Sequence, residues 1–462
     1  MPEGLIGYGL MILCTVIVPG WFGVGLVRAM GLRATSGVRI TLAYGYLVGH
    51  LGLAAVMWLW LLLGKPFPGW LFPVTAAVAG TLLYLRARTS GQPRVAREHS
   101  LWWVLVPLVI VLIPVLDAAA RWNVNPLLFG DESLIWASKA KVWFSAQADE
   151  RGLLLKNFVE HPDYPMWNPL IQNLSFASAG RVLHWENRLP LQAFSVALLM
   201  LMSAAMTRRS HPIIAAVVMF AFAGSTFAMW SQVAGSDVLL ACATLACVEA
   251  LLRWRETGEQ VWWRLAFCAA AAMLASKNEG TLLVPVVAVA FAAHWWLAGA
   301  APQSLGQVLR RALWLLLPLG TWFAHFVHNS TYELGNTLVK DTSGRGMLTR
   351  ITEQFSTYAP QVGQFFYEYC IDVTRSRWIL PATLLAAIAV LCRERLRVRR
   401  SPAFVLLAVT WMTVCGYLLV FVGTPSDLTW HLGTAADRIL LHVLPVACVS
   451  LAMMIWPKKL EV

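Results

Sequence analysis

Residues 5–27 read LIGYGLMILCTVIVPGWFGVGLV, a stretch without one charged side chain. A helix needs about 20 mainly apolar residues to cross the hydrocarbon core of a bilayer. Inside that core every backbone polar group must be satisfied within the segment, so such a run is helical. The stretch lacks a basic leading region and an A-x-A type cleavage site. We therefore predict a retained membrane helix rather than a signal peptide.

Similar apolar runs recur along the whole chain of 462 residues. Hydrophobic residues make up 58% of it and charged residues only 13%, whereas soluble domains are roughly half apolar and a quarter charged. The composition predicts an all-α integral membrane protein with about 13 transmembrane helices. We place them near 6–27, 40–63, 70–85, 102–120, 188–207, 212–231, 236–252, 262–275, 280–298, 311–328, 378–392, 403–422 and 438–456.

The net charge of +12 is explained by topology rather than by a nucleic-acid partner. If the N-terminus lies outside, Lys and Arg gather in the short cytoplasmic loops, which is the usual bias of membrane proteins. Most acidic residues then fall on the outer side, and so do the polar segments 121–187, 230–237, 276–280, 329–377 and 423–438. We therefore expect one extracytoplasmic site.

Three segments follow from this topology. Residues 1–100 hold three membrane helices, 101–330 a membrane core with the outer loop 121–187, and 331–462 the outer loop 329–377 and three C-terminal transmembrane helices. In the loop 121–187, an apolar stripe at helical spacing predicts an amphipathic interfacial helix. The stripe consists of Leu128, Ile135, Trp136, Val142 and Trp143.

The first polar cluster is FGDESLIWASKAKVWF, residues 129–144. Asp131 and Glu132 stand where the interface begins, and a carboxylate there can act as a general base toward a hydroxyl. Capping of the following helix is an equally good explanation. Lys139 and Lys141 can hold a lipid phosphate as point charges, although lysines at a membrane surface often only extend toward the headgroups.

Two further groups of polar residues interrupt the apolar pattern. HPDYP, residues 161–165, brings His161, Asp163 and Tyr164 into what its prolines indicate is a rigid loop. Asp237 begins a span, and SKNEG, with Lys277 and Glu279, separates two spans. Charged residues at such depths are costly and usually mark a site or pair with each other.

Near the last span, WHLGTAADR contains His431 and Arg438. Arg438 can grip a phosphate through two nitrogens, or form an interfacial anchor with Asp437. His325 and His328 lie one turn apart, as metal ligands do, but no third ligand is indicated, so we predict no metal or other cofactor. The sequence contains no phosphate-binding glycine loop, no H-E-x-x-H and no C-x-x-C.

Taken in chain order, the acidic pair, W-x-x-K-A-K at 136–141, HPDYP, the span beginning at Asp237, SKNEG and WHLGTAADR resemble bacterial polytopic glycosyltransferases of the GT-C superfamily. The resemblance covers roughly residues 102–456 and is to the branch with protein O-mannosyltransferases and lipid A aminoarabinose transferases. Asp163 and Tyr164 between the prolines depart from that family's His-Pro-Pro type motif. The three spans before residue 90 also depart from the simplest family pattern, in which the acidic loop follows the first span.

The resemblance implies inverting transfer of a sugar from a polyprenyl-phosphate donor to an acceptor hydroxyl, outside the bacterial cytoplasmic (inner) membrane. It implies Asp131 or Glu132 as the base, and Lys139, Lys141 and Arg438 as ligands of the donor phosphate. The substrate pocket would contain Trp136, His161, Asp163, Tyr164, Asp237, Lys277, Glu279 and His431. The acceptor, whether glycan, lipid or protein, stays open.

Two alternatives remain from the sequence. One is a transporter or flippase of a lipid-linked saccharide, although no inverted repeat of the kind common in transporters is visible. The other is an oligosaccharide ligase or polymerase that uses a diphosphate-linked donor. Such an enzyme would concentrate its catalytic residues in a late outer loop, and 329–377 is long and basic.

Overall fold

The computed structural model describes residues 5–33, 36–64, 69–88, 130–147, 149–183, 186–297, 306, 311–336, 345–394 and 401–457. These residues fold into helices, and no strand forms among them; Ser210 and Pro457 meet only in an isolated bridge. The predicted all-α class is thereby confirmed. The predicted span 102–120 and Leu128 of the apolar stripe lie outside the described residues.

Five of the described helices are long and apolar enough to cross a membrane, namely Gly9–Ala29, Val38–Leu62, Glu186–Arg209, Gly280–Leu297 and Pro402–Val422. A bent pair, Leu428–Leu441 with Leu444–Ile455, brings the number to six. The protein is therefore a multi-pass α-helical membrane protein. Several of the other predicted spans are helices that are shorter or more polar, such as α13 (Gln260–Ser276) and α12 (Asp237–Thr257).

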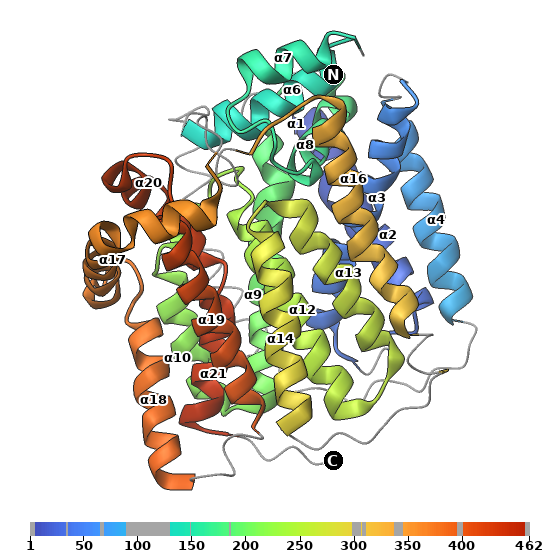
Figure 1. Cartoon of the computed structure of the whole chain (residues 1–462). Helices are drawn as coiled ribbons and strands as arrows, with labels where there is room; N and C mark the ends of the chain where they lie inside the picture. The colour runs from blue at the N-terminus through green and yellow to red at the C-terminus, as the bar shows by residue number, and fades with distance from the viewer. Residues whose placement is uncertain are drawn as a thin grey trace. The chain divides into compact units, whose positions relative to one another are not determined.

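The chain divides into two compact units. Unit 1 comprises Met1–Leu201, Ser231–Lys277 and Trp314–Leu334, and unit 2 comprises Met202–Trp230, Asn278–Leu313 and Gly335–Val462. Unit 1 contains α1 (Leu5–Ile12), η1 (Leu13–Ile17), α2 (Val18–Ala29), α3 (Val38–Leu62), α4 (Leu71–Arg88), η3 (Glu132–Ala137), α6 (Ser138–Ser145), α7 (Arg151–Phe158), α8 (Trp167–Ala179), η4 (Glu186–Arg188), α12, α13 and α16 (Leu316–Thr331) (Figure 1).

Helices α2, α3 and α4 lie side by side in unit 1 (Figure 1). Glycines allow this close approach: a Cβ added at Gly23 of α2 would lie 1.7 Å from the carbonyl oxygen of Gly45 in α3. Gly49, one turn after Gly45, meets the carbonyl of Pro19 at 2.0 Å in the same construction. Small residues four apart are the usual means by which membrane helices pack closely.

Unit 2 contains α10 (Pro212–Ala223), α11 (Phe227–Trp230), α14 (Gly280–Leu297), α17 (Met347–Ile371), α18 (Ile379–Glu394), α19 (Pro402–Val422), α20 (Leu428–Leu441) and α21 (Leu444–Ile455). Helix α9 (Leu189–Arg209) begins in unit 1 and ends in unit 2.

The last predicted span, 438–456, differs from the structure. Arg438 lies in the last turn of α20, and α21 follows at an angle of 50° to it. Pro445 stands in the first turn of α21, where its missing N–H costs nothing, but it could not continue a straight helix from α20. Asp437 and Arg438 therefore close a helix rather than open one, and the prediction was wrong on this point.

The segment 329–377, interpreted above as an outer loop, contains the 25-residue helix α17. Some apolar side chains of α17 are buried and others are exposed: Val362 and Tyr369 are buried, whereas Leu348 and Phe355 are exposed. The sequence analysis missed this helix because α17 contains more polar residues than a membrane span does, so it was interpreted as a loop. It packs on α19 and α20 within unit 2.

Candidate functional site

A buried ion pair holds three separate segments of unit 1 together. The Arg188 guanidinium, in η4, donates to both carboxylate oxygens of Glu132, with 2.7 Å from Nη2 to Oε2. The backbone N–H of Ala234 donates to Glu132 Oε1 at 2.9 Å. The side chain of Glu132 is 0% exposed and that of Arg188 is 8% exposed. Glu132 is thus enclosed by donors, an arrangement suited to holding the π-helical turn η3 in place.

A chain of buried amides extends this connection. Asn187, next to Arg188, donates to Gln172 of α8, and Gln172 donates to Asn168 at 2.7 Å. Asn168 in turn donates to the Ala234 carbonyl at 2.9 Å and to the Ser236 hydroxyl at 3.1 Å. Buried polar side chains that satisfy one another make an arrangement rigid. Sequence reasoning missed all of these groups; the polar triplet ENR at 186–188, directly before a span, was the available signal.

Lys139 fastens the HPDYP loop from inside. Its ammonium donates to the carbonyl of Pro162 at 2.6 Å and to that of Tyr164. Burial lowers the pKa of Lys139 to about 7, and the nearby Asp163 opposes this shift. The prediction of a non-helical loop is confirmed, and His161 at its start adopts a positive φ of 48°. Because its ammonium is turned to backbone carbonyls, Lys139 is better suited to positioning this loop than to holding a phosphate.

Tyr164 connects this loop to its neighbours. Its ring stacks on Trp136 at 5.3 Å between centroids and on His161 at 5.4 Å. The Lys277 ammonium lies 5.9 Å from the Tyr164 ring centroid and pairs with Asp237 at 2.9 Å. Asp237 and Lys277 are both almost fully buried, and they stand at the start of α12 and just after α13. Of the two explanations left open by the sequence, the pairing of these charges with each other is therefore present.

Asp131 precedes the Glu132 pair and is half-buried. It stands at the N-cap position of η3 but makes no capping hydrogen bond through its side chain, so the structure gives no support to the capping explanation. Lys141 lies on α6 and is also half-buried. Asp131 is thus the more accessible of the two candidate bases, because Glu132 is enclosed.

Unit 1 therefore brings together Glu132, Trp136, Lys139, His161, Asp163, Tyr164, Asp237 and Lys277. Glu279, His431 and Arg438 belong to unit 2. There, His431 shares a hydrogen bond of 2.7 Å with the Thr424 hydroxyl, and the Arg438 guanidinium lies over the Trp230 ring at 5.5 Å. No cluster of three or more metal-binding side chains occurs within the described ranges.

A comparison with protein families, curated proteins and solved structures finds no match to this chain.

Proposed function

We propose that the protein is an inverting glycosyltransferase of the GT-C type, which transfers a sugar from a polyprenyl-phosphate donor to an acceptor hydroxyl. The resemblance of its polar motifs suggested this reaction. The observation that supports it most is that segments of unit 1 far apart in the sequence meet at Glu132, the residue next to the half-buried Asp131. We place this site outside the bacterial inner membrane, in a fold with about 13 spans.

In this proposal the carboxylate of Asp131 removes the proton of the acceptor hydroxyl. The hydroxyl oxygen then bonds to the anomeric carbon from the face opposite the phosphate, and the bond from that carbon to the phosphate oxygen breaks. The polyprenyl phosphate leaves as an anion, which fixed cations stabilise without having to protonate it. Lys141, which is half-buried on α6 of unit 1, is our candidate for one of those cations.

The other charges have a different role. Glu132 with Arg188, and Asp237 with Lys277, are buried and mutually neutralised. Lys139 is committed to the carbonyls of Pro162 and Tyr164. We assign these groups to positioning, so that Tyr164, which stacks on the buried Trp136, and His161 form an aromatic wall for the sugar.

The test is the substitution Asp131→Asn in protein reconstituted in nanodiscs, with Asp149→Asn as the matched control because Asp149 is exposed. Removal of the base lowers turnover by roughly a hundredfold or more, while donor binding and the control variant stay at the wild-type level. Turnover by Asp131→Asn equal to that of the control would exclude Asp131 as the base.

Donor binding is tested at Lys141. Lys141→Ala is expected to weaken the binding of the polyprenyl-phosphate sugar, since a cation close to the phosphate is lost. Binding is measured by titration of the donor into the purified variant. An unchanged affinity would exclude Lys141 as a ligand of the donor phosphate.

A further inference from the structure

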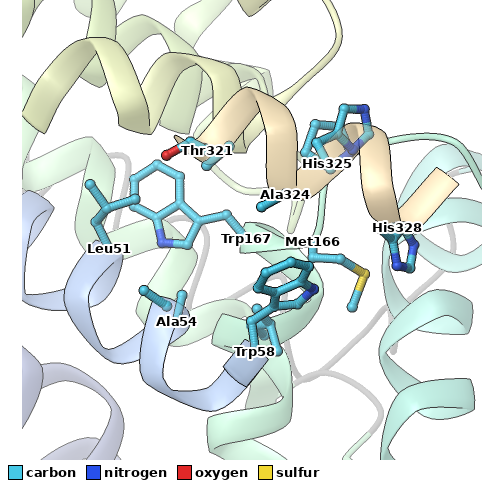
Figure 2. A pocket seen from close by; sticks show the side chains of 13 residues that line it. Leu51, Ala54, Trp58, Met166, Trp167, Thr321, Ala324, His325 and His328 are labelled. Atoms are coloured by element: carbon cyan, nitrogen blue, oxygen red, sulfur yellow. The ribbon is translucent and has the colours of Figure 1, made fainter. Parts of the chain in front are cut away.

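A second feature of unit 1 is a pocket of ≈ 120 Å³. It is lined by residues of α3, by Pro165 at the end of the HPDYP loop and residues 166–170 after it, by Ala275 of α13 and by α16. Figure 2 shows Trp58 and Trp167 in its walls, with Ala324, His325 and His328 coming from α16. An apolar cavity of about 150 Å³ can hold a benzene ring. The pocket is therefore large enough for a short stretch of hydrocarbon chain.

Two buried polar side chains in this apolar lining have ring nitrogens without a hydrogen-bond partner among the described residues. Both ring nitrogens of His328 and the indole N–H of Trp167 are without a hydrogen bond from the part of the chain that the structure describes. Each of these residues is only 2% exposed. Leaving such groups unsatisfied costs free energy, so they indicate an occupant that can form hydrogen bonds.

The chemistry of the imidazole limits which functional group of a bound molecule can satisfy it. A neutral His ring carries one N–H donor and one acceptor nitrogen, and an indole carries a donor only. A hydroxyl both donates and accepts, so it satisfies either nitrogen of His328. A group that only accepts, such as an ether, serves one nitrogen at most.

The pocket is reached from a surface of a candidate membrane helix. Ala55 lines it from α3 and is exposed, while its neighbour Ala54 is buried. Helix α3 is long and apolar enough to span a bilayer, and α16 exposes Trp322, Phe323 and Phe326 beside its pocket residues. An occupant that enters here comes from the hydrocarbon region.

We propose that this pocket binds a hydroxyl-bearing membrane amphiphile, with a short segment of its alkyl or isoprenoid chain among the α3 and α16 side chains and its hydroxyl at His328. This inference does not depend on the proposed sugar transfer. The bound molecule contacts Pro165 and Met166, and so adjoins the HPDYP loop of the candidate site.

The first test uses a long-chain alcohol with a photoreactive diazirine in its chain, added to the full-length protein in nanodiscs. Labelled positions are mapped by mass spectrometry. We expect labels concentrated on 51–58, 165–170 and 321–328, and their loss in Ala55→Trp, whose larger side chain fills the mouth. Ala389→Trp is the matched control, because Ala389 is exposed on α18, outside the pocket. Labels spread evenly over lipid-facing helices, or unchanged by Ala55→Trp, would overturn the proposal.

The second test examines the hydroxyl with His328→Phe, a variant expected to fold because His328 packs against the rings of Trp143 and Tyr332. The unlabelled alcohol and its methyl ether compete with the photoprobe. Wild type should prefer the alcohol by roughly fivefold, as expected for one hydrogen bond, and His328→Phe should bind both alike. An equal affinity of wild type for alcohol and ether would contradict the role of the hydroxyl.

Discussion

At the scale of single residues, the pair Glu132–Arg188 is expected to have a large effect on stability. Both groups are buried, so Arg188→Met leaves a carboxylate without its partner. The loss of one member of a buried pair costs about 3–5 kcal/mol. We expect Arg188→Met to be destabilised by that order and the double variant with Glu132→Gln to be less destabilised than the sum of the single ones.

The measurement is chemical or thermal unfolding of the four proteins of this cycle in one detergent. Additive effects of the two substitutions would show that the ion pair does not couple the segments.

Lys139 gives a prediction for pH. Burial lowers its pKa from 10.5 to about 7 in the folded protein. Between these two values the unfolded chain binds more protons at this group than the folded one, so stability rises with pH by up to about 1.4 kcal/mol per unit. We expect the stability of wild type relative to Lys139→Met to increase from pH 7 to pH 10. Parallel pH profiles of the melting temperatures would contradict the lowered pKa.

At the scale of helices, the glycine contact between α2 and α3 can be tested directly. Gly23→Ala places a methyl group against the Gly45 carbonyl, so the helices must move apart; such overpacking costs about 1–3 kcal/mol. Gly9→Ala is the control, because a Cβ at Gly9 meets nothing within 4 Å. We expect a lower melting temperature for Gly23→Ala alone. Equal melting temperatures would show that α2 and α3 tolerate a wider separation.

The helices also show what the sequence could and could not predict. The starts of α12 at Asp237 and of α14 after SKNEG were predicted, because a charge or glycine that interrupts an apolar run marks a helix boundary. The bend between α20 and α21 was not, since the apolar run continues through it. The π-helical turn at Glu132 was also beyond sequence reasoning, because Arg188, which pairs with Glu132, lies 56 residues away in the chain.

For the candidate site, the sequence singled out several polar residues that lie close together in unit 1, but not their contacts. Lys139 was predicted to bind the donor phosphate, yet its ammonium faces the backbone carbonyls of Pro162 and Tyr164. The amide chain from Asn168 to Asn187 was missed because Asn and Gln in an apolar helix carry no motif. Charged side chains pair with the groups that lie next to them in space. Their spacing along the chain does not reveal these partners.

At the scale of the whole molecule, we propose that this membrane protein cleaves the bond between a sugar and its lipid phosphate, rather than only binding or moving the lipid-linked sugar. A transferase and a flippase differ in what happens to the covalent bonds of the donor. A transferase breaks the bond between the sugar and the phosphate, whereas a flippase returns the lipid intact on the other side.

The most direct measurement is mass spectrometry of polyprenyl-phosphate sugars incubated with the wild-type protein in proteoliposomes, together with a membrane extract that supplies acceptors. We predict that one donor of the panel is consumed and that free polyprenyl phosphate appears in equal amount. Donors that stay intact, while they bind the protein or change leaflet, would contradict the transferase account and favour lipid transport.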